Sequence, residues 1–119
     1  MTTTPINTNP KEVIDEDGAI NYYWGDLLHN GTGPAYISPS GEHREYWVRG
    51  LRHRTDGPAV ELPNGDYEYW ENGNRHNIHG PATSYGDLLE YWIDGRQYDY
   101  EEYIMKLFQL GYVNGKKFI

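Results

Sequence analysis

Residues 57–80 read GPAVELPNGDYEYWENGNRHNIHG and contain the signals of one complete structural unit. After the opening Gly-Pro, Ala59 to Leu62 form a short strand candidate, and Asn64-Gly65 predicts a tight turn because these residues tolerate positive φ angles. The return strand runs from Asp66 to Glu71, and Asn72-Gly73 predicts a second turn. Proline cannot donate to a strand ladder, so the next Gly-Pro is expected at a bend or a strand start. The stretch therefore predicts a β-hairpin unit.

The same landmarks recur along the chain. Tyr-Trp pairs end at Trp24, Trp47, Trp70 and Trp92, at spacings of 23, 23 and 22 residues. Gly-Pro-Ala occurs three times, each time four residues after a histidine: His29, His53 and His76. Three of the tryptophans have glycine at the third residue after them, and the first copy has lost one residue there. Each unit is too small to bury a face alone, so stacked units are expected to share one continuous antiparallel sheet.

The predicted fold is an all-β repeat: a single-layer, twisted antiparallel sheet of about four tandem hairpin units, with eight to ten short strands and one C-terminal capping helix. Residues 1–12 are rich in Thr, Asn and Pro and are expected to be a disordered tail. Residues 13–98 form the repeat domain, and residues 99–119 form the helix and a short terminal hairpin at Asn114-Gly115. Asp99 and Glu102 predict a capping box. The apolar stripe of this helix either covers the last strand or also packs a second subunit, which would give a homo-oligomer.

Adjacent Tyr and Trp side chains point to opposite faces of a strand. We therefore expect one face to carry a tryptophan column flanked by glutamates and the other to carry a tyrosine column, with most of these rings stabilising neighbouring strands. The tryptophan column would be Trp24, Trp47, Trp70 and Trp92 with Glu45, Glu68 and Glu90, and the tyrosine column Tyr23, Tyr46, Tyr69 and Tyr91.

Composition excludes several classes of function. The 119 residues fit one domain and include no cysteine, which rules out disulfides and thiolate metal sites. The net charge of −8 argues against nucleic acid and anionic membrane surfaces as partners, because both attract Lys and Arg. No apolar run approaches the ~20 residues that span a bilayer. A cytoplasmic protein is expected.

The recurring polar residues do not predict catalysis. Equivalent residues of adjacent units lie ~10 Å apart, so the three histidines are too distant to share one metal ion, and a turn-stabilising hydrogen bond is the expected role. The glutamates recur because the unit recurs, and no pocket is expected to desolvate them. We therefore expect no enzyme, no catalytic residue, no metal and no cofactor. The basic cluster either contacts an anionic ligand or acidic partner, or consists of solvated turn charges; its members are Arg49, Arg52 and Arg54.

The unit resembles the MORN repeat, in which a Tyr/Trp strand is followed by Trp-x-x-Gly-x-x-His and a further glycine. Tyr69-Trp70, Gly73, His76 and Gly80 carry the resemblance, which extends from Gly18 to about Tyr98. The chain is more similar still to the Gly-Pro-Ala variants found in uncharacterised tailed-phage and giant-virus proteins. It departs from the usual repeat by the Pro-Ala insertion and by Tyr98 in place of a fourth histidine. The resemblance implies an elongated single-layer sheet that serves as an interaction scaffold, with no common catalytic residue, and the lipid binding proposed for the family disagrees with the acidic charge.

A non-enzymatic binding protein is the expected function. Its favoured form is a protein-interaction module, and the viral resemblance implies one that docks on and inhibits a host protein, such as a defence factor, in the host cytoplasm. The alternatives are a binder or sponge for a small ligand such as a nucleotide, held between stacked rings, and a structural component of an assembly. Aromatic residues with a charged rim are typical of interaction hot spots. The expected partner contacts are Trp24, Trp47, Trp70, Trp92, Tyr67, Glu45, Glu68 and Glu90.

Overall fold

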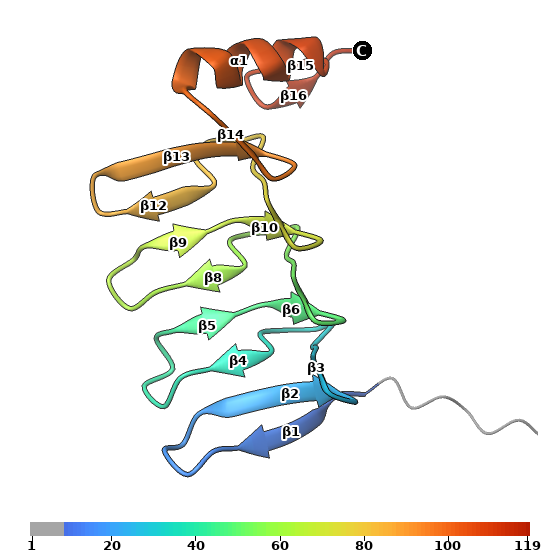
Figure 1. Cartoon of the computed structure of the whole chain (residues 1–119), viewed down its shortest axis with the longest axis vertical. Coiled ribbons are helices and arrows are strands. Elements are labelled where there is room, and N and C mark those ends of the chain that lie inside the picture. Colours follow the sequence, from blue (N-terminus) through green and yellow to red (C-terminus); the bar gives the residue numbers. More distant parts are fainter. Residues whose placement is uncertain (1–8) are drawn as a thin grey trace, which may run out of the picture.

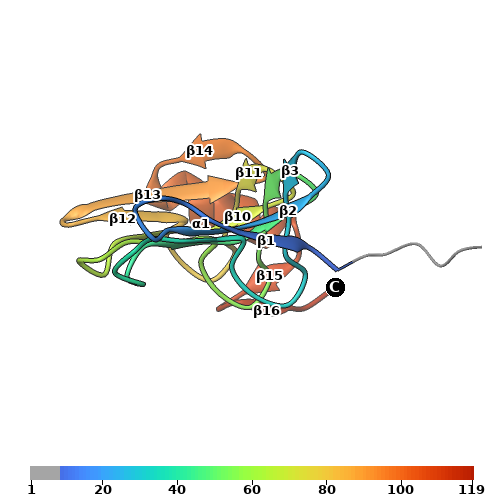
Figure 2. The same ribbon diagram turned by 90° about the horizontal axis from the view of Figure 1, so that it is seen from below.

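The computed structural model describes residues 9–119 as a stack of β-hairpins followed by one helix (Figure 1). Viewed from below, the strands form a thin slab (Figure 2), and the molecule measures 52 Å along its longest axis but 19 Å along its shortest. The predicted antiparallel sheet of hairpins with a C-terminal helix is confirmed. Residues 1–8 of the expected tail lie outside the described residues. Lys11 and Glu12, which the sequence places in that tail, instead belong to a strand.

The main sheet contains ten strands within residues 9–119, and their order in space follows their order in the chain. Every pairing is antiparallel, so each unit lies beside the units that precede and follow it. The strands of the main path are β1 (Lys11–Ile14), β2 (Ile20–Trp24), β4 (Tyr36–Ile37), β5 (Arg44–Glu45), β8 (Val60–Glu61), β9 (Tyr67–Glu68), β12 (Thr83–Tyr85), β13 (Leu88–Ile93) and β14 (Arg96–Tyr98), and β3 (Leu27–Leu28) pairs with β2.

Each middle unit also has a second, smaller hairpin, seen on the right in Figure 1. One pairs β6 (Trp47–Val48) with β7 (Leu51–Arg52), and the next pairs β10 (Trp70–Glu71) with β11 (Asn74–Arg75). The two-residue turns of these hairpins have positive φ at both positions, as in a type I′ turn: 52° and 79° at Arg49-Gly50, 51° and 81° at Asn72-Gly73.

Directly opposed residues on successive strands share one face of the sheet. The first row defines the Glu–Trp face, which also carries Trp47, Trp70 and Trp92. The second row defines the tyrosine face, which also carries Tyr46, Tyr69 and Tyr91. The first row is Val13, Asn21, Tyr36, Glu45, Val60, Glu68, Thr83 and Glu90; the second is Ile14, Ile20, Ile37, Arg44, Glu61, Tyr67, Ser84 and Leu89.

The sequence places small residues where the backbone is most enclosed. The alanine of each Gly-Pro-Ala is fully buried, with no exposed surface at Ala35, Ala59 or Ala82. These alanines also form hydrogen bonds between neighbouring strands, because their carbonyls accept from the N–H groups of Tyr22, Tyr46 and Tyr69 respectively. A larger side chain at these positions would have to displace the neighbouring strand.

Helix α1 (Tyr100–Gln109) closes the far end of the stack. The predicted capping box is present: the Asp99 carboxylate accepts from the N–H of Glu102 at 2.8 Å, and the Glu102 side chain accepts from the N–H of Asp99 at 3.2 Å. Tyr103 and Leu107 pack on Ile93 to form the main hydrophobic cluster. The predicted terminal hairpin is also present, as β15 (Tyr112–Val113) and β16 (Lys116–Lys117).

Candidate functional site

Three tryptophans of the Glu–Trp face are fixed by the glutamate two residues earlier in the chain. The indole N–H of Trp70 donates to Glu68 at 2.7 Å, and the corresponding distances are 2.9 Å for Trp47 to Glu45 and 3.0 Å for Trp92 to Glu90. Glu68 also accepts a hydrogen bond from the Tyr85 hydroxyl. The predicted column is therefore present in the last three units, with its glutamates serving as acceptors.

Arginines alternate with these tryptophan rings. The guanidinium of Arg52 lies 4.8 Å from the ring centroid of Trp47 and 5.2 Å from that of Trp70. Arg75 repeats the arrangement between Trp70 and Trp92, at 5.1 and 5.3 Å. Both guanidinium groups also approach a glutamate, Arg52 at 3.7 Å from Glu45 and Arg75 at 3.6 Å from Glu90. We call this stack the Trp–Arg ladder, formed by Trp47, Arg52, Trp70, Arg75 and Trp92.

The first unit does not contribute to the ladder, and Trp24 is not part of the tryptophan column. Tyr23 pairs with Leu28 as Trp47 pairs with Arg52, so Tyr23 occupies the ladder position and Trp24 lies one residue further on, equivalent to Val48. Because a shift of one residue reverses the face, Trp24 points away from the ladder. It instead contacts the ring of His29 at 5.2 Å, with the guanidinium of Arg49 6.0 Å from its ring.

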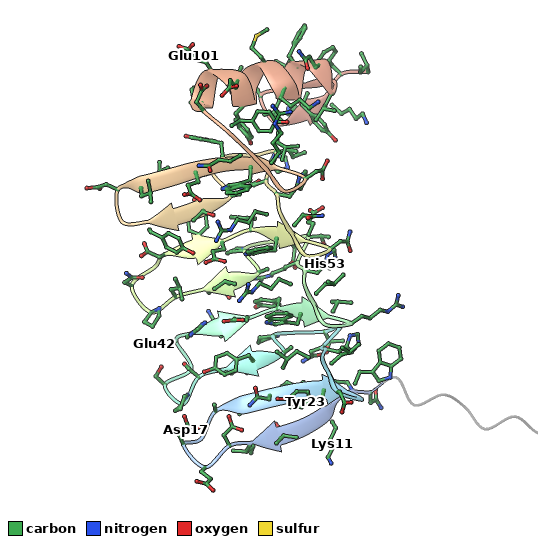
Figure 3. All side chains as sticks on the ribbon, viewed as in Figure 1. Lys11, Asp17, Tyr23, Glu42, His53 and Glu101 are labelled. Carbon is green, nitrogen blue, oxygen red and sulfur yellow. The ribbon has the colours of Figure 1, made fainter. Side chains whose placement is uncertain are left out.

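The tyrosine column shifts by the same single residue in the first unit. Tyr46 donates its N–H to the Ala59 carbonyl at 2.7 Å, and Tyr22 makes the same bond to Ala35 at 2.8 Å. The tyrosine column thus begins at Tyr22 rather than at the expected Tyr23. Figure 3 labels Tyr23 on strand β2. The Gly25-Asp26 turn has two residues, like Arg49-Gly50, but Trp24 directly precedes it, whereas Val48 separates Trp47 from its turn.

The recurring histidines join neighbouring units through their turns. Nδ1 of His29 accepts from the N–H of Arg49 at 2.9 Å, and Nδ1 of His53 accepts from the N–H of Asn72 at 3.0 Å. His76 does the same for Asp94 at 3.0 Å. The predicted turn-stabilising role is confirmed, with the addition that each histidine holds the turn of the following unit. Within residues 9–119 no three His, Asp or Glu side chains gather closely enough to hold a metal ion.

The three arginines of the basic cluster are separated. Arg52 is part of the ladder, whereas Arg54 pairs with Asp56 at 2.9 Å and lies 4.0 Å from the ring of Tyr46 on the opposite face. Arg49 is exposed beside Trp24. The three guanidinium groups therefore do not converge on one anion, and the gaps between the tryptophan rings are filled by Arg52 and Arg75.

The hairpin tips at one rim of the sheet carry acidic residues that do not recur at a fixed spacing in the sequence. Asp17 and Glu42 mark this rim on the left of Figure 3. The tip segments 15–18, 38–42, 62–66 and 85–87 contain no Lys or Arg. None of their carboxylates forms an ion pair with Lys or Arg in residues 9–119. We call these residues the acidic rim: Asp15, Glu16, Asp17, Glu42, Asp66 and Asp87.

Tyr67 lies beside this rim but on the tyrosine face, so the expected partner residues are divided between the two faces. Its ring meets that of Tyr69 edge-on at 5.4 Å, and the two line a shallow depression of about 480 Å³ with Arg44, Glu61 and Asp66. Burial raises the pKa of Tyr67, with a further contribution from Tyr69 and Tyr91. Leu89, in the same row, is 48% exposed. An apolar and aromatic strip therefore borders the acidic rim.

An apolar depression of about 630 Å³ lies between helix α1 and the terminal hairpin, and its lining includes Tyr100, Ile104 and Phe108. No helix in residues 9–119 combines the length and the apolar character needed to cross a bilayer. Comparisons with protein-family models, curated proteins and solved structures find no match to this chain.

Proposed function

We propose that this chain is a non-enzymatic protein-interaction module that docks through its acidic rim on a cationic surface of another protein. The observation that carries the proposal is the set of six rim carboxylates at successive hairpin tips, with no Lys or Arg in the tip segments to neutralise them. Aligned tips of one sign of charge create a local field that steers a partner of opposite charge.

The neighbouring strip supports a protein rather than a small cation as the partner. Tyr67 and the half-exposed Leu89 lie in one row behind the tips, where they would contact the partner once charge attraction has brought it close. Aromatic and apolar groups next to charged rims supply most of the affinity in protein interfaces. A thin sheet also suits a broad contact better than the capture of a small molecule.

The Trp–Arg ladder serves this proposal as scaffold. It fixes the spacing of the last three units, and therefore the spacing of their rim tips, because each Arg bridges the rings of two successive units. The narrower proposal, that the partner is a host protein that the chain inhibits, is supported by the resemblance of the repeat to phage and giant-virus proteins.

The test is a pull-down with three tagged forms of the chain. The rim variant replaces three tip carboxylates, Asp17→Asn, Glu42→Gln and Asp87→Asn. The control replaces three on the opposite side of the sheet, Asp26→Asn, Glu71→Gln and Asp94→Asn, so both have the same net charge. We expect a stoichiometric partner that is retained by the wild type and the control, is lost from the rim variant, and elutes with rising salt. Equal retention by both variants, or no retained protein, would contradict the proposal.

A further inference from the structure

We propose that two copies of this chain form a two-fold symmetric dimer through the outer surface of helix α1 and the terminal hairpin. The inference does not depend on the proposed function, since it concerns the opposite end of the chain from β1 and uses none of the rim residues. It starts from an apolar surface that the fold leaves uncovered, which we call the cap patch: Tyr100, Ile104, Met105, Phe108, Phe118 and Ile119.

The helix has more apolar surface than its own fold buries. Tyr103 and Leu107 face the sheet and are only 2% and 7% exposed. Tyr100, Ile104 and Phe108 follow one another at four-residue spacing on a different face, and Phe108 is 58% exposed. The terminal hairpin extends this surface, because Phe118 lies 5.3 Å from Phe108. A contiguous apolar surface of this kind marks a contact site.

Charge is distributed unequally at the two ends of the cap patch. Glu101 and Glu102 lie in the first turn of the helix, and Figure 3 labels Glu101 at that end. Lys116 and Lys117 lie in β16, which adjoins the last turn through the Phe108–Phe118 contact. None of these four residues forms an ion pair within residues 9–119. The patch is thus acidic at one end, apolar in the middle and basic at the other.

Such a surface is complementary to itself when two copies meet antiparallel. A two-fold axis at Ile104 places Tyr100 of one copy opposite Phe108 of the other. The same operation brings the glutamate end of each helix to the lysine end of its partner, so both ends gain attraction. An isologous contact of this kind closes on itself and leaves no patch free for further growth. The second copy is therefore the occupant that the charge pattern of the patch favours.

The first test is the mass of the full chain by light scattering or sedimentation across a concentration series. We expect a dimer of about twice the 13.8 kDa chain mass. Phe108→Glu should weaken the dimer by about 30-fold or more, as for an interface hot spot. Leu88→Glu is the matched control, since Leu88 is 57% exposed on the sheet. A monomer at all concentrations, or a dimer that Phe108→Glu leaves unchanged while circular dichroism shows both variants folded, would overturn the proposal.

Charge exchange tests the antiparallel arrangement itself. Lys116→Glu combined with Lys117→Glu should give a monomer, because both ends of the dimer become acidic. Glu101→Lys should weaken the dimer for the opposite reason, and it leaves the Glu102 capping box in place. Mixing the two variants should restore a heterodimer, since Glu101 and Glu102 of one copy then face Lys116 and Lys117 of the other, and at the second end the lysine introduced at position 101 faces the two introduced glutamates. If each variant dimerises as well alone as in the mixture, the proposed orientation is wrong.

Discussion

The guanidinium of Arg52 lies 4.8 Å from the ring centroid of Trp47. The two residues are paired across a small hairpin that has only two residues in each strand. The same guanidinium faces Trp70 of the next unit at 5.2 Å. A hairpin of this length is not stable alone in water, because too few contacts offset its ordering. The cross-unit stacking of Arg52 therefore connects its small hairpin to the next one, and Arg75 makes the following connection between Trp70 and Trp92.

Removing Arg52 should destabilise the array. We expect Arg52→Ala to lower the free energy of unfolding by about 2 kcal/mol, because two ring contacts and the packing of the aliphatic stem are lost together. Arg52→Lys should recover only part of this, since an ammonium group cannot lie flat against two rings. Urea denaturation gives both values. Arg49→Ala is the control, as Arg49 is exposed and 6.0 Å from one ring, and its effect should stay within about 0.5 kcal/mol.

The position of Trp24 predicts that the four tryptophans are not energetically equivalent. Trp24→Val introduces the residue type found at the equivalent Val48 and should cost less than about 1 kcal/mol. Trp47→Val removes a ladder ring that Glu45 and Arg52 hold and should cost about 3 kcal/mol. Chemical denaturation of the two variants side by side checks the order. Equal losses would contradict the prediction that the ladder tryptophans contribute more stability than Trp24.

Much of the fold could be predicted because its signals are local. Gly-Pro-Ala, the Asn-Gly turns and the Asp99 capping box each act within a few residues, and the recurrence of the unit implied the stacking of one hairpin on the next. The first unit was misregistered because its tryptophan was aligned with the others. Counting back from the histidine corrects this: Tyr22, Tyr46 and Tyr69 each lie seven residues before His29, His53 and His76.

The candidate site was harder to predict because it depends on distances across the sheet. Arg52 and Arg75 each precede a repeat histidine, which was a visible signal for their shared role in the ladder. The alternation of the strand correctly predicts that Tyr67 lies on the face opposite Glu68, away from the ladder. The acidic rim was missed because its residues are scattered along the chain and only the antiparallel order brings their turns to one side.

The histidine bonds predict a local change in backbone protection. His53→Ala removes the acceptor for the N–H of Asn72, at a cost of about 1 kcal/mol. Amide hydrogen exchange at Asn72 should accelerate about fivefold, since that free energy corresponds to a factor of this size. The N–H of Asp94 is an internal control because it bonds to His76 of the next unit. Unchanged exchange at Asn72, or equal acceleration at Asp94, would contradict a local role for His53.

Tyr103 joins helix α1 to the segment of residues 77–80 through its hydroxyl group. The hydroxyl donates to the Asn77 carbonyl at 2.6 Å and accepts from the N–H of Gly80 at 3.2 Å. Tyr103→Phe leaves both groups without this partner and should cost about 1–3 kcal/mol in unfolding free energy. Tyr112→Phe is a suitable control, because its ring borders the same cluster. A loss no larger than that of the control would show that the hydroxyl bonds do not stabilise the cap.

The stabilisation by Tyr103 should also depend on pH in a defined direction. Burial raises the pKa of Tyr103 above its ordinary value of 10.0, the bond from Gly80 opposes this in part, and Tyr91 and Tyr100 add to the increase. Between the unfolded and the folded pKa, the native state keeps a proton that the unfolded chain has lost, so stability falls as pH rises. The contribution is therefore complete below about pH 10 and declines above it.

The difference in unfolding free energy between wild type and Tyr103→Phe should shrink from about pH 9 to about pH 11. The titration of the other tyrosines cancels in this difference. A difference that stays constant or grows over this range would mean that the hydroxyl is not buried as a proton donor.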